Sequence, residues 1–128
     1  HGPDQNRARA LYYLGVSYYN NEEYDKAILA YSRAESFAAD CDSLYLGMIY
    51  SAKSYTYNCN YNSSQELYYA KRAFETFSSI KANEYKRISS YRLAVSYHNN
   101  DNYEKAIKQY DYLIDSTSFI DFIIFICY

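Results

Sequence analysis

The side chains that could perform covalent or metal chemistry are scattered along this sequence. The three cysteines, Cys41, Cys59 and Cys127, are widely spaced and form neither a Cys-x-x-Cys pair nor a Cys/His cluster. This spacing favours neither a zinc site nor a disulfide framework, and we expect thiols that behave as small apolar groups. His98 is the only histidine besides His1, and we expect it on a surface or in a groove rather than in a catalytic or metal site.

The carboxylates are no more suggestive of catalysis. Glu22, Glu23 and Asp101 lie in polar stretches that resemble turns, where caps and solvated charge are the usual roles. Motifs of serine hydrolases, zinc proteases, phosphate loops and dinucleotide sites are absent, and three glycines could hardly build one. We therefore expect a protein that is not an enzyme and that has no catalytic, cofactor-binding or metal-binding residues.

Tyrosine is the residue type most suggestive of function. The chain has 20 tyrosines among 128 residues and no tryptophan. A tyrosine side chain combines apolar area with a polar tip and few rotatable bonds, which suits a recognition surface. A solvated face that is merely rich in tyrosine is the competing interpretation.

The composition indicates which elements must position these side chains. Hydrophobic residues make up 49% of the chain and charged residues 22%, as in an ordinary globular domain. With 3 glycines and 1 proline, the turns of an all-β fold could not be built, so we expect helices. The net charge of −2 argues against a nucleic-acid partner.

An internal repeat organises the chain. Residues 14–31 and 93–110 align without gaps at an offset of 79, with 11 identities in 18 positions. Leu11, Leu14, Gly15 and Tyr18 share one face of a helix. Gly15 costs about 1 kcal/mol of helix propensity relative to alanine, so we expect a neighbouring helix to approach it closely.

This pattern resembles the tetratricopeptide repeat, a helix–turn–helix unit. The first unit matches at eight positions: Leu11, Leu14, Gly15, Tyr18, Tyr24, Ala27, Tyr31 and Ala34. The third unit matches at six positions: Leu93, Ala94, Tyr97, Tyr103, Ala106 and Tyr110. The helix-ending proline of the family is absent. The resemblance implies stacked helix pairs whose first helices line a concave peptide-binding groove.

The offset of 79 requires a middle unit of about 39 or 40 residues. Its first helix is expected from Ser43 to Tyr57, followed by a turn at residues 58–62. Ser63 and Glu66 are spaced as a capping box for the second helix. Aligning this unit on Tyr61 or on Ala70 and Ala73 gives registers two residues apart, and we prefer the second, with a longer turn.

The predicted fold is all-α: a right-handed α-solenoid of about three tetratricopeptide-like repeats in a single domain, residues 1–128. The repeats cover approximately 7–40, 42–79 and 82–115, and an apolar C-terminal segment, 116–128, caps the last pair. Helices are expected near 5–20, 23–38, 42–58, 64–79, 82–98 and 103–115. Three stacked pairs are about the minimum for a stable array.

The resemblance also predicts the groove residues. Carried over by position, they are Arg9, Tyr12, Val16, Tyr19, Asn20, Tyr91, Val95, His98 and Asn99. The family's clamp for a C-terminal carboxylate is not matched, because Tyr12, Val16 and Asn20 stand where its lysine, asparagine and arginine would be.

The last ten residues, FIDFIIFICY, break the repeat pattern. They are too few to span a bilayer, which requires about 20. A packed cap, the start of a fourth repeat, a strand and the leading edge of a membrane span are all compatible with them, and we prefer the cap. Because one helix face buries about half of such residues, the segment could also support a weak homodimer.

These features predict a non-enzymatic module that binds a protein or peptide in a tyrosine-rich groove. The alternative is the sensory or regulatory part of a longer transcriptional regulator or membrane-bound signalling protein. The first residues, His-Gly-Pro-Asp, do not resemble a signal peptide and suggest a cloning remnant or the edge of an excised domain. We expect a soluble domain, and neither the cytoplasm nor the periplasm is favoured.

Overall fold

Six helices follow one another in the computed structural model, which describes residues 2–116. They are α1 (Gly2–Asn20), α2 (Tyr24–Ala38), α3 (Ser43–Cys59), α4 (Ser63–Ser79), α5 (Asn83–Asn99) and α6 (Tyr103–Ser116). Each agrees with its predicted range within three residues at either end. The predicted C-terminal cap falls, apart from Ser116, outside the described residues.

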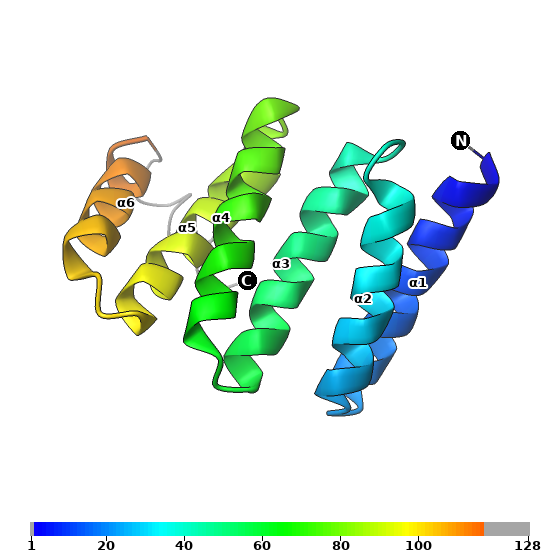
Figure 1. Cartoon of the computed structure of the whole chain (residues 1–128). Coiled ribbons are helices and arrows are strands. Elements are labelled where there is room, and N and C mark those ends of the chain that lie inside the picture. The colour runs from blue at the N-terminus through cyan, green and yellow to red at the C-terminus, as the bar shows by residue number, and fades with distance from the viewer. Residues whose placement is uncertain (1, 117–128) are drawn as a thin grey trace.

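The helices stack side by side from α1 to α6 (Figure 1). Each helix pairs with the next, and α1 also contacts α3. The first helices of the pairs, α1, α3 and α5, form one layer, and α2, α4 and α6 form the other. This is the α-solenoid architecture that the repeat pattern predicts.

The three turns within the helix pairs are equivalent in geometry. Each has three residues, and the middle one adopts a left-handed backbone: Glu22, Tyr61 and Asp101 have φ of 60°, 56° and 60°. The backbone N–H of the next residue donates to the carbonyl five residues earlier, at 2.9 Å in every case. The turn of the middle unit is therefore no longer than the others, contrary to the prediction.

These turns fix the register of the middle repeat. Position 27 of the first repeat corresponds to 66 in the second and 106 in the third, because Ala27, Glu66 and Ala106 make the same first helical hydrogen bond. The offset of 39 aligns Ala73 with Ala34, which is the alignment that the sequence favoured.

The predicted capping box at Ser63 and Glu66 is wrong. The N-cap of α4 is Asn62, whose side chain accepts a hydrogen bond from the backbone N–H of Gln65. Glu66 points instead into the interior, where it is 1% exposed. A carboxylate there needs partners, and the neighbouring helices supply them.

Small residues allow the layers to approach closely. Ala27, Ala34 and Ala38 are fully buried beside the ring of Tyr31. A Cβ atom on Gly15 would collide with the Tyr31 ring, and one on Gly47 would collide with the Phe77 ring. Gly15 therefore lies at the close helix contact that its position in the sequence predicts.

Candidate functional site

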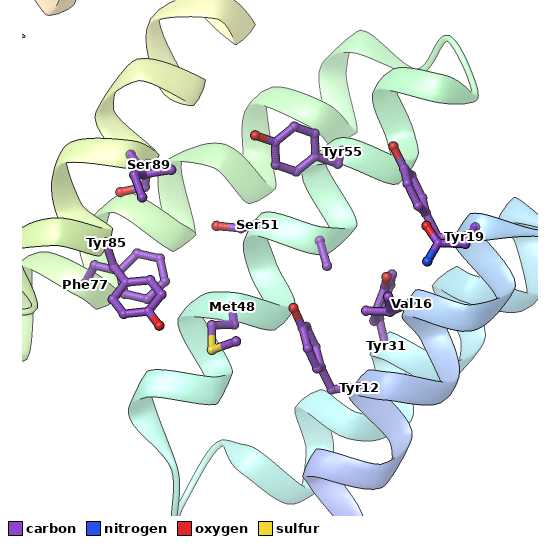
Figure 2. Close-up of a pocket in the computed structure, with 13 residues that line it drawn as sticks. Tyr12, Val16, Tyr19, Tyr31, Met48, Ser51, Tyr55, Phe77, Tyr85 and Ser89 are labelled. Carbon is purple, nitrogen blue, oxygen red and sulfur yellow. The ribbon is translucent and has the colours of Figure 1, made fainter. Parts of the chain in front are cut away.

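A hollow of about 540 Å³ lies across the layer formed by α1, α3 and α5. Figure 2 shows side chains from these three helices converging on it, with Tyr12 and Tyr19 on one side and Tyr85 on the other. Its lining is Tyr12, Val16, Tyr19, Asn20, Tyr31, Met48, Ser51, Ala52, Tyr55, Phe77, Tyr85, Ile88 and Ser89. The volume lies within the range of ordinary ligand sites.

The base of the hollow is formed by two rings from the other helix layer. Tyr31 of α2 packs over Gly15, and Phe77 of α4 packs over Gly47. Both rings are 2% exposed. They reach the hollow because the glycines remove the side chains that would otherwise cover them, so the same close contacts that hold the layers together also form this floor.

The rim carries aromatic rings that are partly free. Tyr55 is 44% exposed, Tyr85 is 40% exposed and Ile88 is 48% exposed. Tyr85 stacks on Phe77, with ring centroids 5.1 Å apart, which fixes one wall. Tyr12 packs edge to face against Tyr45 at 5.7 Å, which fixes the opposite wall. The rings are thus held in place before any ligand arrives, which lowers the entropy cost of binding.

The hydroxyls of Tyr12 and Tyr19 in the hollow remain protonated well above neutral pH. Burial raises the pKa of Tyr12, and the neighbouring Tyr13 and Tyr85 add to this effect. The hydroxyl of Tyr19 forms a 3.5 Å contact with Sγ of Cys59. That contact, together with burial, raises the pKa of Tyr19 to about 12. The hydroxyls can therefore both donate and accept hydrogen bonds.

Among residues 2–116, none that lines this hollow carries a formal charge. Behind the lining lies Arg92, whose guanidinium carbon is 4.3 Å from the Tyr55 ring centroid. Arg92 Nη2 donates to Glu66 Oε2 at 2.7 Å. That carboxylate therefore balances the charge of the arginine behind the lining.

Four of the nine predicted groove residues line the hollow: Tyr12, Val16, Tyr19 and Asn20. Arg9 lies outside the lining and binds Asp42 Oδ2 through Nε and Nη2, at 3.3 and 3.2 Å. This pair joins α1 to the N-terminus of α3 and is a structural contact.

The four predicted residues on α5 also lie outside the lining. Tyr91 packs against Tyr110 of α6, with ring centroids 6.2 Å apart. His98 is exposed and contacts the ring of Tyr103, while Asn99 donates to Glu66 at 3.3 Å. Val95 is half-buried.

The hollow crosses the three helices obliquely. On α5 it is lined by Tyr85, Ile88 and Ser89, about two turns before the residues obtained by adding 79 to the α1 positions. Successive repeats of a solenoid are rotated, so the groove does not keep the same repeat position along the array. For α3 the sequence did hold a usable signal, because adding 39 to Tyr12 and Val16 gives Ser51 and Tyr55, which both line it.

The hollow offers apolar area and hydroxyl groups but no ligands for a metal. Within residues 2–116, no group of three or more histidine, cysteine or carboxylate side chains is placed to hold a metal ion. None of the helices in the same range has the length and apolar character needed to cross a bilayer.

Comparison with known proteins identifies the repeat. Tetratricopeptide repeat models match residues 8–40 and residues 89–116. These two stretches cover most of the first and third helix–turn–helix units, and the middle unit is not matched. No curated protein and no solved structure matches the chain. Tetratricopeptide repeats are typically non-catalytic and generally mediate protein–protein interaction. The two matches, together with the array of three helix pairs, support a tetratricopeptide repeat domain.

Proposed function

We propose that the chain binds an extended segment of a protein partner in the hollow across α1, α3 and α5. The observation that carries this proposal is the uncharged, aromatic lining, with Tyr55, Tyr85 and Ile88 each about 40–50% exposed. An apolar patch of this kind rimmed by polar atoms is costly to leave in water and marks an interaction surface.

The chemistry of the lining indicates which segments fit. A charged side chain would lose its hydration in the hollow without gaining a counter-charge. Apolar side chains would instead cover the rings of the floor. The hydroxyls of Tyr12, Tyr19 and Ser51 are available for the peptide backbone, which must keep its hydrogen bonds when it leaves water.

The proposal can be tested with peptides selected from a displayed random library against the unaltered chain. Selected peptides should be rich in apolar residues, and Tyr55→Ala or Tyr85→Ala should weaken their binding about tenfold or more, as expected for aromatic anchors. Tyr61→Ala is the matched control, because Tyr61 lies in a turn and is 95% exposed.

Salt provides a second test. Binding should change little between low and high ionic strength, because the lining has no charge to screen. Peptides that are bound equally well by all three variants, or whose affinity falls steeply with salt, would show that a different surface is used.

A further inference from the structure

We infer that residues 122–126 of this chain, FIIFI, occupy the hollow of the same molecule and compete there with the partner. This inference rests on the proposed function, because it names an occupant of the same groove. Within residues 117–128 the only charged side chain is Asp121, and Phe119, Ile120, Phe122, Ile123, Ile124, Phe125 and Ile126 are all large and apolar.

The first step is the match in chemistry. The chain has 28 residues of the types Asp, Glu, Lys and Arg (13 basic and 15 acidic); all except Asp121 fall within the described residues 2–116, and none of those lines the hollow. The described lining is thus uncharged and aromatic, and residues 122–126 are five consecutive large apolar residues. Both would otherwise expose apolar surface to water.

The second step is the short path between them. Helix α6 ends at Ser116, and Tyr112 in its last turns lines a small surface depression together with Asn83, Lys86 and Arg87 of α5. The end of α6 therefore lies beside the beginning of α5, which also carries Tyr85 and Ile88 of the hollow. Only Thr117 and Ser118 separate Ser116 from Phe119.

The third step is reach. Twelve residues after Ser116 span up to about 40 Å when extended, whereas a helix with its side chains is about 10–12 Å across. The segment can pass around α5 and still lay several side chains across the hollow. Neighbouring molecules are not needed for this contact, which distinguishes it from the alternative in which the segment joins two copies.

A single tryptophan can report on the segment, because the chain has none of its own. In the full chain carrying Phe122→Trp, the indole emission should be blue-shifted and protected from iodide. Ser51→Lys, which places a charge in the hollow, should shift the emission to the red and increase quenching severalfold. The matched control is Ser36→Lys on the exposed face of α2, which should change neither.

Dilution distinguishes a segment that belongs to the same molecule from one that is supplied by a second copy. The protected emission should be the same at all dilutions, and light scattering should show a monomer. Protection that disappears on dilution would show that a second copy supplies the segment and would overturn the inference. An indole that is exposed in the unaltered groove, or that responds equally to Ser51→Lys and Ser36→Lys, would overturn it as well.

Competition links this inference to the proposed function while keeping the two distinguishable. Ile123→Asp in the full chain should raise the affinity for a library-selected peptide at least fivefold, whereas Thr117→Asp, outside the apolar run, should not. Peptides that bind the groove equally in both variants would refute the inference and leave the proposed function standing. If neither variant binds any selected peptide, the proposed function fails.

Discussion

The outer repeats and the middle repeat share the same backbone arrangement but differ in the side chains at equivalent positions. The position occupied by Ala27 and Ala106 in the outer repeats holds Glu66 in the middle one, and all three are buried. The carboxylate is accommodated because α3 and α5 provide its partners. Glu66 Oε2 accepts hydrogen bonds from Asn58, Arg92, Ser96 and Asn99, at 2.7–3.3 Å.

The large aromatic residue has also moved. In the first repeat Tyr31 packs over Gly15, while Ala38 and Ala8 are buried in the same hydrophobic cluster. In the middle repeat, Ala70 is the equivalent of Tyr31 and Ser54 is the equivalent of Gly15. The contact between a ring and a glycine is made there by Phe77 and Gly47. These two residues are the equivalents of Ala38 and Ala8. The ring–glycine contact of the middle repeat therefore lies seven residues, or two turns, away from the repeat positions that make this contact in the first repeat. The packing of the two helix layers requires a glycine opposite each of these two buried rings, but it does not require the ring at a fixed position of the repeat.

The largest effect should come from removing the carboxylate of the middle repeat. Glu66→Ala restores the residue of the outer repeats but leaves Arg92, 12% exposed, without its carboxylate partner. Losing one member of a buried ion pair typically costs about 3–5 kcal/mol. Urea denaturation should therefore show a large fall in the free energy of unfolding.

Two variants test whether the pairing is the cause. Glu104→Ala removes an acid that is 83% exposed and contacts Lys108 at 3.7 Å, so its cost should be at most about 0.5 kcal/mol. The double variant Glu66→Ala/Arg92→Leu should regain most of the lost stability. If the double variant is less stable than Glu66→Ala alone, the charge pairing is not the origin of the effect.

Overpacking the glycine contact of the first repeat should have the next largest effect. Gly15→Leu places a side chain in the space of the Tyr31 ring, and this ring is buried. We expect a loss of about 1–3 kcal/mol and a lower midpoint in thermal denaturation. Gly2→Leu is the control, because nothing lies within 4 Å of its Cβ position; equal midpoints for both variants would contradict the contact.

High pH should destabilise the fold through Tyr31, a buried tyrosine of the first repeat whose equivalent in the middle repeat is Ala70. Burial raises the pKa of Tyr31 above its ordinary value. A raised folded-state pKa contributes stability that is fully present below the unfolded pKa, about 10, and is lost as the pH rises through the folded-state value. The free energy of unfolding should therefore fall as the pH rises above about 10.

Tyr31→Phe removes this titrating group and should reduce the alkaline loss of stability. Denaturant titrations from about pH 9 to about pH 12 measure it, and tyrosinate absorbance reports ionisation directly. Tyr61→Phe, in the exposed turn, is the matched control and should leave the pH profile unchanged. Profiles that are identical for both variants would mean that Tyr31 ionises equally easily in the folded and unfolded chain.

The smallest effect concerns the turn of the middle repeat. Tyr61 holds a left-handed backbone, φ 56°, while its side chain is 95% exposed. Such a conformation costs an ordinary residue about 1–2 kcal/mol, and asparagine tolerates it better. Tyr61→Asn should therefore raise the free energy of unfolding by up to about 1 kcal/mol, measured by urea denaturation. Tyr61→Ala retains a Cβ atom and should bring little gain; a larger gain from alanine would argue against backbone strain.

The sequence by itself determined the elements and their order. Scarce glycine and proline, the 79-residue repeat and the polar turns predicted six helices and their pairing, because these features act through local backbone preferences and helical periodicity. Gly15 was also identified correctly, since a glycine inside a helix has a cost that a close contact must offset. Tyr12, Val16, Tyr19 and Asn20 were assigned to the groove through the family resemblance, and the structure places them in the lining.

Only the tertiary structure decided the composition of the middle repeat and the course of the hollow. Glu66 is compatible with a capping role in the sequence, and its burial depends on Arg92, 26 residues later. The lining residues Tyr85 and Ile88 depend on how far each repeat rotates relative to the previous one. Both are set by packing between helices distant in sequence, and local spacing carries no information about that packing.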